Sequence, residues 1–484
     1  MALNASRSKF SLKLMVHKDE KRVIFAEADS NFVDALFSIM TLPLATIVRL
    51  LRKVPDEKLK PIGSLNNLYQ SLLDLSTNCF SSEENKWLML YPKTSSHDAC
   101  RKLKLNINDE SPTKYFICQN IDCSRRSGAH FCTCNLARCI YCGMTMNLEI
   151  NYKDTTVVSN VFSGVFASDM TNFIITDDLR VIPNCPSSMV QLLCELGIPA
   201  VSFLDEMTFD IGLDQILNLL KGAILFKNPL TYMVFPSSPS ICDLVKPGQE
   251  TLLKHLTAET SKSLTLTVTV QKSTSKFLYA EADSDFVEFL FGFLEIPLGY
   301  MIGKLMNSSS CFESLNNMYS SISSMTAGEY IKSQDLKNML LDPQLMHTKL
   351  SEKQIFPLSV FCDSKSYCHT YMSPLGFYAY MTRSVDREGH EKEMFCICSL
   401  KDSRVDGRYL KASAKFMVTD DLVITPLSLL SSITMLSKLN VPLNDVEVHK
   451  VSIGIKEGLE ILDASLKSFS TFTDSILKKI TVTR

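Results

Sequence analysis

The sequence predicts an α+β fold made of two homologous tandem domains, each with short strands, several amphipathic helices and a zinc-ribbon-like cysteine loop. Three observations support this prediction: segments that recur in the same order, strand and helix patterns that follow one another irregularly, and a concentrated group of cysteines. Regular alternation of strands and helices is typical of a doubly wound parallel sheet, so its absence here favours the α+β class.

Three segments of the chain occur twice, in the same order and with nearly the same spacing, which indicates a duplication. FAEADSNFVDALFSIMTLPLATIVRLL (25–51) returns as YAEADSDFVEFLFGFLEIPLGYMIGKL (279–305), GSLNNLYQSL (63–72) as ESLNNMYSSI (313–322), and NFIITDDLRVIP (172–183) as KFMVTDDLVITP (415–426). We predict a first copy at 8–235, a linker at 236–261, a second copy at 262–470 and a C-terminal tail at 471–484.

Each copy is expected to begin with a pair of short strands. Residues 11–17 and 22–28 alternate apolar and polar side chains on either side of the charged segment KDEK, which is typical of a hairpin. The apolar residues then change to helical spacing. Ser30 is the predicted N-cap of this helix, and Asp34 lies in its first turn.

Helices follow in each copy. Pro43 lacks the N–H that a helix interior needs, so we expect it to separate two helical pieces, as Pro297 does in the second copy. A third short helix is expected after Ser64. Beyond the TDDL strands we predict helices at 187–197, 212–225 and 454–466.

The composition is that of an ordinary globular protein, with 45% apolar residues, 21% charged residues and a formal net charge of −2. This charge gives no overall reason to expect a nucleic-acid partner. The N-terminal segment lacks the apolar stretch of a secretory signal, and no apolar run is long enough to span a bilayer. We therefore expect an intracellular protein, cytoplasmic or nuclear, without a membrane partner. Its 16 cysteines are then thiols or metal ligands rather than disulfides.

A structural zinc site is predicted in the loop at about 115–147. The segment CIYCG places Cys139 and Cys142 two residues apart before Gly143, and two thiolates at this spacing can bind one tetrahedral ion. Cys118 and Cys123 are the preferred second pair of ligands. The alternative ligands are Cys132 and Cys134, with His130 as a substitute for one of them.

A weaker second site is predicted in the degenerate cysteine loop of the second copy, at about 360–400. Its candidate ligands are Cys362, Cys368, Cys396 and Cys398. The spacing is less typical of zinc, because Cys398 is followed by Ser399 and not by glycine.

Two acidic motifs have a functional and a structural interpretation. Glu27 and Asp29 can form a carboxylate pair for acid–base chemistry, or they can mark a strand that ends in a capped helix. Asp177 and Asp178 can likewise be turn residues. The structural interpretation is favoured for both, because no base or nucleophile is visible nearby in the sequence.

Basic residues around the cysteines offer a third alternative, binding of single-stranded nucleic acid through the cysteine loop. Phosphate contacts and base stacking need cations and exposed aromatic rings, here supplied by Tyr115, Phe116 and Phe131. The structural alternative is a solvated loop, which the net charge of the chain favours. The cations concerned are Arg101, Lys102, Lys104, Arg125, Arg126 and Arg138.

The segments VIFAEADSNFVDALFSIMTLPLATIVRLL, SLNNLYQSL and FIITDDLRVIP, together with the cysteine stretch ending in CGMTMN, resemble a plant-specific family catalogued as a domain of unknown function, DUF family 674. The resemblance covers nearly the whole chain and both copies. It implies a plant protein with this duplicated arrangement, and it implies no activity, substrate or catalytic residue. The family's cysteine stretch is similar at Cys118, Cys123 and the pair before Gly143. The chain departs from the family at Cys132 and Cys134, and in lacking a glycine after Cys398.

The sequence thus favours a non-enzymatic, zinc-stabilised tandem-domain protein that acts through contact with an unidentified protein partner. No phosphate-binding loop, nucleophile elbow or kinase motif set is present in the sequence. The alternatives are an enzyme that uses the Glu27 and Asp29 region, and a protein that binds single-stranded nucleic acid through the basic cysteine loop.

Overall fold

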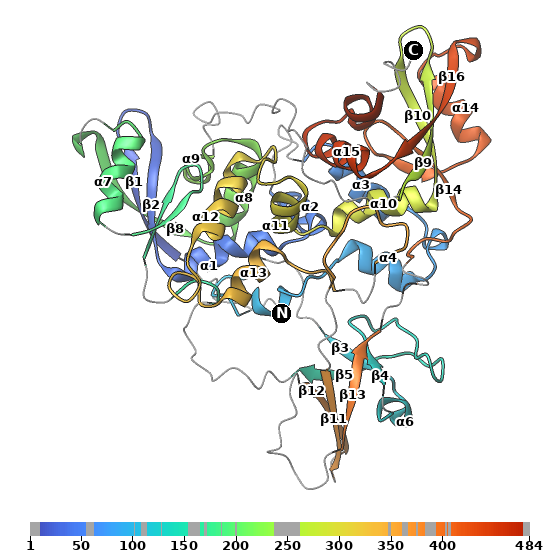
Figure 1. Cartoon of the computed structure of the whole chain (residues 1–484), viewed down its shortest axis with the longest axis horizontal. Coiled ribbons are helices and arrows are strands. Elements are labelled where there is room, and N and C mark those ends of the chain that lie inside the picture. Colours follow the sequence, from blue (N-terminus) through green and yellow to red (C-terminus); the bar gives the residue numbers. More distant parts are fainter. Residues whose placement is uncertain are drawn as a thin grey trace, which may run out of the picture.

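The computed structural model places a central group of helices between two five-stranded sheets, with a third sheet set apart from both (Figure 1). Helices and antiparallel strands are mixed without regular alternation, so the fold is α+β, as the sequence predicts. The structure describes residues 10–54, 62–100, 102–107, 114–126, 128–152, 165–168, 172–184, 186–198, 201–236, 262–346, 350–360, 366–373, 376–382, 394–401, 404 and 408–477.

The first sheet has the strand order β7-β6-β2-β1-β8, and all of its neighbouring strands are antiparallel. Buried and exposed side chains alternate along β1, as the pattern FSLKLMVH predicts for a strand with one face on the core. The strands are β1 Phe10–His17, β2 Arg22–Ala28, β6 Phe173–Thr176, β7 Val181–Pro183 and β8 Leu204–Ile211.

The second sheet repeats this order position by position, as β15-β14-β10-β9-β16. Its strands are also antiparallel throughout. One helix covers the outer face of each sheet. Leu192 of α7 (Pro186–Glu195) shares a hydrophobic cluster with Phe25 in the first, and Leu436 of α14 (Leu429–Lys438) shares one with Tyr279 in the second. The strands are β9 Leu264–Gln271, β10 Lys276–Asp283, β14 Lys415–Val418, β15 Ile424–Pro426 and β16 Val446–Ile453.

The inner faces of both sheets bury one continuous hydrophobic core together with the central helices. In the first half the helices are α1 Ser30–Ser38, α2 Leu44–Leu51, α3 Leu65–Asp74, α4 Glu83–Leu90, α5 His97–Cys100, α6 Ile121–Ser124, α7 Pro186–Glu195, α8 Leu213–Leu225 and α9 Pro229–Val234, with 3-10 turns η1 Ile39–Thr41, η2 Thr77–Cys79 and η3 Val201–Phe203. In the second half they are α10 Ser284–Glu295, α11 Leu298–Tyr300, α12 Glu313–Ser324, α13 Gln334–Leu341, α14 Leu429–Lys438 and α15 Ile455–Lys467, with short elements η5 Met301–Leu305, η6 Leu443–Asp445 and η7 Thr473–Leu477.

Two prolines meet where the halves join. Pro43 precedes α2 and Pro297 precedes α11, so each proline separates two helical pieces as predicted. The two residues form an isolated antiparallel bridge. The N–H of Leu44 donates to Ile296 O and the N–H of Leu298 donates to Leu42 O, each at 3.0 Å. The segment that leads into α2 in the first half is therefore hydrogen-bonded to the segment that leads into α11 in the second.

Each half also supplies a helix that packs against the sheet of the other half. Helix α12 of the second half lies against β7 of the first sheet, and α3 of the first half lies against β15 of the second. Ser321 Oγ accepts the N–H of Val181 at 3.0 Å, and Ser71 Oγ accepts the N–H of Ile424 at 2.9 Å. The predicted boundaries at 8–235 and 262–470 therefore separate segments that interlock in space.

The end of the second half is longer than predicted. Residues from 471 onward were expected to form a tail, but Phe472 and Ile476 are fully buried. The Phe472 ring stacks on Phe277, with 5.1 Å between the ring centroids. The expectation was wrong at this point because the apolar residues of this short segment fill the inner face of the second sheet. Within the described residues, no helix has the length and hydropathy needed to cross a bilayer.

The third sheet combines strands from both halves in the order β3-β5-β12-β11-β13-β4. Strands β12 and β5 pair in parallel, and so do β13 and β4. The first half supplies β3 Tyr115–Ile117, β4 Ala129–Phe131 and β5 Leu148–Tyr152, and the second half supplies β11 Ser366–Ser373, β12 Gly376–Thr382 and β13 Met394–Leu400. Both predicted cysteine loops therefore contribute strands to one sheet.

Candidate metal centre

Four cysteine sulfurs converge beside the third sheet. The Sγ atoms of Cys118, Cys123, Cys139 and Cys142 all lie within 4.8 Å of one another, and those of Cys118 and Cys142 are 3.5 Å apart. A tetrahedral zinc ion with Zn–S bonds of about 2.3 Å requires S–S separations of about 3.8 Å. The preferred ligand set from the sequence is therefore the set whose geometry fits a tetrahedral ion.

Cys139 and Cys142 lie at the tip of a short hairpin. The N–H of Cys139 donates to Met144 O at 2.8 Å, and the N–H of Gly143 donates to Cys139 O at 2.9 Å. Gly143 has a φ of +72°, a left-handed conformation that glycine adopts without steric cost. The glycine of CIYCG therefore closes the turn that directs both sulfurs to the same side.

The other pair is held by the turn between β3 and α6. Asn120 Oδ1 accepts the N–H of Asp122 at 3.0 Å, which caps the start of α6, and Ser124 Oγ donates to Cys118 O at 2.9 Å. The N–H of Asn120 also points at Cys118 Sγ, at 3.4 Å. These contacts fix Cys118 at the end of β3 and Cys123 on α6.

The sulfur environment differs between the two pairs. Burial raises the pKa of the Cys118 thiol to about 12, so its thiolate is stable at neutral pH only beside a cation. Burial acts in the same direction on Cys139, but N–H groups of Cys142 and Tyr141 donate to its sulfur and hold its pKa below the ordinary value. Backbone N–H donors thus favour the thiolate form of Cys139, which metal binding requires.

The alternative ligands do not belong to this cluster. Cys132 Sγ donates to Cys134 O at 3.1 Å, and burial raises the pKa of these thiols to about 12 and about 11, respectively. Cys132 packs with Phe116 and Met146 in a small apolar cluster. His130 lies with its ring tilted against Tyr141, 6.2 Å away, and burial lowers its pKa. Among the described residues, the side chains that converge within metal-binding distance do not include Cys132, Cys134 or His130.

The second set of cysteines stays a prediction. Cys362 lies outside the described residues. The backbone places Cys368 on β11 opposite Cys396 on β13, and Cys398 opposite Ser366. This register brings two of the four candidate positions to directly opposed places on neighbouring strands.

The acidic pair of the alternative enzyme has local structural partners. Glu27 accepts a hydrogen bond from Asn184 Nδ2 at 3.0 Å. Asp29, and not Ser30 as predicted, is the N-cap of α1, since its carboxylate accepts the N–H of Phe32 at 2.9 Å. The prediction missed by one residue because serine and aspartate are both good caps. Asp283 caps α10 in the same way.

The TDDL motif also has a structural role in each half. Asp177 accepts the N–H and the hydroxyl of Thr231 at 2.8 and 2.7 Å, and burial raises its pKa to about 7. Asp420 does the same with Thr473, and burial raises its pKa. A cleft of about 350 Å³ lies beside Asp177, but the carboxylate is turned toward the start of α9. The favoured interpretation of Asp177 as a turn residue agrees with these contacts.

Two buried acids, Asp34 and Glu288, accept backbone N–H groups from distant segments, a role that the sequence did not predict. Asp34 accepts N–H groups of Phe166 and Ala167 at 2.9 and 2.6 Å, and Glu288 accepts that of Tyr409 at 2.8 Å. Burial raises their pKa values to about 6 and about 7. The sequence contains a signal for these buried acids, because both occupy the same place in the repeated segment, on an otherwise apolar helix face.

The aromatic rings of the nucleic-acid alternative are not available for stacking. Tyr115, Phe116 and Phe131 are all buried, and Tyr115 packs edge-on against Phe131. Lys104 places its ammonium 5.1 Å from the ring of Phe10, in the body of the first half. Arg101 lies outside the described residues.

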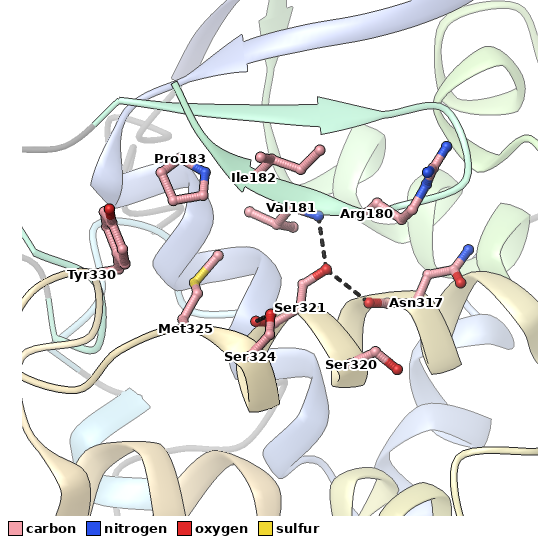
Figure 2. Close-up of a pocket in the computed structure, with 10 residues that line it drawn as sticks. All are labelled: Arg180, Val181, Ile182, Pro183, Asn317, Ser320, Ser321, Ser324, Met325 and Tyr330. Carbon is pink, nitrogen blue, oxygen red and sulfur yellow. Dashed lines mark hydrogen bonds between the residues drawn. The ribbon is translucent and has the colours of Figure 1, made fainter. Parts of the chain in front are cut away.

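A groove of about 430 Å³ is lined by β7 and α12, where the two halves meet (Figure 2). Ser321 occupies the N–H of Val181 and donates to Asn317 O at 2.8 Å. Pro183 has no N–H, so this strand edge has no donor left at these two positions for an added strand. The groove is lined by Arg180, Val181, Ile182, Pro183, Asn317, Ser320, Ser321, Ser324, Met325 and Tyr330, a set without any Asp, Glu, His or Cys.

The chain matches the protein family described as "Protein of unknown function (DUF674)" over residues 6–457. It belongs to the DUF674 family. Membership agrees with the resemblance drawn from the repeated segments and the cysteine stretch. The DUF674 match is one continuous span and assigns no activity to any residue. Searches of the curated proteins and of the solved structures found no match for this chain.

Proposed function

We propose that the protein is a non-enzymatic, zinc-stabilised tandem-domain protein that acts through contacts with another protein. The observation that carries the proposal is the convergence of Cys118, Cys123, Cys139 and Cys142 within 4.8 Å. Four sulfur ligands suit zinc better than magnesium or calcium, which prefer oxygen.

A structural role for zinc follows from the ligand set. A centre with four cysteines leaves no open position for water or substrate, whereas catalytic zinc keeps one. The loops around the centre bury only a small apolar cluster of their own, which includes Cys132, Ala137 and Met146. A metal that bridges β3, α6 and the hairpin supplies the cross-link that this cluster is too small to replace.

The tandem arrangement is part of the proposal. Two sheets of the same strand order support descent from one duplicated domain. The reciprocal serine contacts of α3 and α12 support it further, since Ser71 and Ser321 occupy matching positions of the repeat. We place such a thiol-rich protein in a reducing compartment, the cytoplasm or the nucleus.

The non-enzymatic part rests on how the polar groups are used. The groove between the halves has no acid, histidine or cysteine in its lining. A cavity lined by Glu288, Glu295 and Tyr409 has a volume of only about 40 Å³. Asp29 and Asp177 cap or anchor helices. Contact with a protein partner is the function that remains best supported.

Metal analysis of the purified chain tests the proposal. We expect about one zinc per chain, and a Cys139→Ser/Cys142→Ser variant should lose the metal and unfold at a lower temperature. Cys194→Ser is the matched control, because this exposed cysteine lies on α7, the helix over the outer face of the first sheet. A folded, metal-free protein whose melting temperature does not respond to chelator would overturn the proposal. A second zinc that is lost in Cys368→Ser/Cys396→Ser would show that the other half binds metal too.

A further inference from the structure

We infer that the tip of the cysteine hairpin is the docking surface, and that its partner is an acidic segment of another protein that also carries apolar side chains. This inference rests on the proposed function and names its surface. We define the knuckle tip as Leu136, Arg138, Ile140, Tyr141 and Met144. The four large apolar side chains of this set are 44%, 59%, 43% and 46% exposed, in chain order. Four such side chains within nine residues form an apolar patch that a protein normally covers.

The hairpin backbone directs these side chains outward. Ala137 and Cys139 are buried, while Arg138 and Ile140 alternate with them and are exposed. The N–H of Met146 donates to Ala137 O at 2.8 Å, which fixes the register of the two arms. A surface that is held in place before binding loses little conformational entropy on association.

The position of the hairpin leaves room for a partner. The third sheet and α6 lie apart from the two five-stranded sheets and the central helices (Figure 1). The patch therefore belongs to a part of the molecule that projects from the shared core of the two halves.

The charges at the tip select an acidic partner. Residues 122–147 contain three arginines and one aspartate, whereas the whole chain has a formal net charge of −2. Arg126 lies 5.5 Å from the centroid of the Tyr141 ring, and Arg138 Nη1 donates to Gly143 O at 3.3 Å. Four thiolates around zinc carry excess negative charge, but N–H groups of Asn120, Tyr141 and Cys142 offset part of it. Arg126 and Arg138 are exposed, as is the one acid of this segment, Asp122, so cations outnumber acids among its exposed charged side chains.

The same surface is a poor match for nucleic acid. Tyr141 is the exposed aromatic ring of the tip. The guanidinium of Arg126 lies against this ring, and the Tyr141 hydroxyl donates to Gly128 O at 3.0 Å. The other exposed apolar groups are aliphatic or thioether, and they cannot stack on bases as aromatic rings do. They fit leucine, isoleucine or phenylalanine side chains of a protein segment.

Selection of random peptides displayed on phage tests the inference with the full chain as bait. We expect the enriched peptides to be net negative and to contain apolar residues. A synthetic peptide of the consensus should bind the zinc-loaded chain, and Ile140→Asp/Met144→Asp should weaken this binding by about tenfold or more. Arg126→Glu/Arg138→Glu should weaken it too, with an effect that shrinks at high salt. Leu429→Asp/Ile433→Asp is the matched control, because these exposed apolar residues lie on α14 in another part of the fold.

Zinc content and melting temperature of each variant separate this inference from the proposed function. A chain that holds zinc but enriches no peptide, or enriches basic peptides, would overturn the docking surface and leave the zinc centre standing. Equal binding by the Ile140→Asp/Met144→Asp variant would also overturn it. Preference for phosphatidylserine vesicles or for oligo-dT over the consensus peptide would assign the tip to a membrane or to single-stranded nucleic acid instead.

Discussion

Asn67 of the first half donates two hydrogen bonds to Asp421 of the second half. Its Nδ2 atom lies 3.0 Å from the backbone oxygen and 3.1 Å from the carboxylate. Asn317 of the second half makes the same two contacts with Asp178 of the first, at 2.9 and 3.2 Å. The second asparagine of the SLNN segment in each half thus binds the TDDL turn of the opposite half. Neither half therefore contains all the residues that pack around its own turn.

We expect the two halves to need each other for folding. When residues 1–249 and 250–484 are made as separate chains, each should lack the helix that completes its sheet and should aggregate or remain unfolded. Co-expressed fragments should associate, because α3 and α12 then find their opposite sheets. Copurification of an untagged fragment with a tagged one measures this, and a monomeric, cooperatively folded fragment would contradict it.

Asn67→Ala should reduce the free energy of unfolding by about 1–3 kcal/mol, because it leaves acceptors of Asp421 without their donor in a half-buried place. Denaturant titration measures the loss. Gln70→Ala on the same helix is the control, since Gln70 is exposed and its contacts with Asp74 and Arg52 both lie within the first half. A loss no greater than that of the control would show that the contact between the halves adds little.

Stability should depend on pH through Asp34. Burial raises its pKa from 3.8 to about 6, so the folded chain holds this proton more tightly than the unfolded chain does. The free energy of unfolding contributed by this group therefore falls as the pH rises through that window. Asp34→Asn should flatten the slope between these pH values, while Asp210→Asn, at an exposed acid on β8, should leave it unchanged. Urea melts at several pH values measure the slope, and an unchanged slope in Asp34→Asn would refute the assignment.

Asn85→Leu should stabilise the protein by about 1–3 kcal/mol. Asn85 is fully buried in α4, and among the described residues neither atom of its amide group has a hydrogen-bond partner. Ser82 caps α4 through the N–H of Asn85, as Ser333 caps α13 through the N–H of Leu336, so leucine already occupies the matching place in the other half. Thermal melting measures the gain. A lower melting temperature than that of the unmodified chain would indicate that the amide has a partner which leucine cannot replace.

Local signals in the sequence were sufficient for much of the structure. The spacing of Cys139 and Cys142 before Gly143 predicts the turn that carries these two cysteines, because the turn itself requires a two-residue separation and a glycine. Pro43 and Pro297 break their helices by a covalent property of proline. The strand at residues 10–17 follows from its own alternation of side chains.

Contacts between distant segments were beyond the same reasoning. Nothing in SLNNLYQSL states whether Asn67 meets the turn of its own half or of the other, since both turns have the sequence TDDL. The sequence predicted Asp34 only as an acid in the first turn of its helix, because its amide partners at residues 165–167 lie far along the chain. Cys132 and Cys134 have spacing that suits a ligand pair, and only the three-dimensional convergence of the other four sulfurs separates them from the set.

The mixed strand order of the third sheet has a consequence for biosynthesis. Strands β4 and β5 leave the ribosome long before β11, β12 and β13, which must insert between them to finish the sheet. The nascent first half therefore exposes unpaired strand edges during the translation of the second. All four sulfurs of the metal centre are already present once residue 142 has been made. Binding of an ion at that moment would order the hairpin before β11, β12 and β13 have been synthesised.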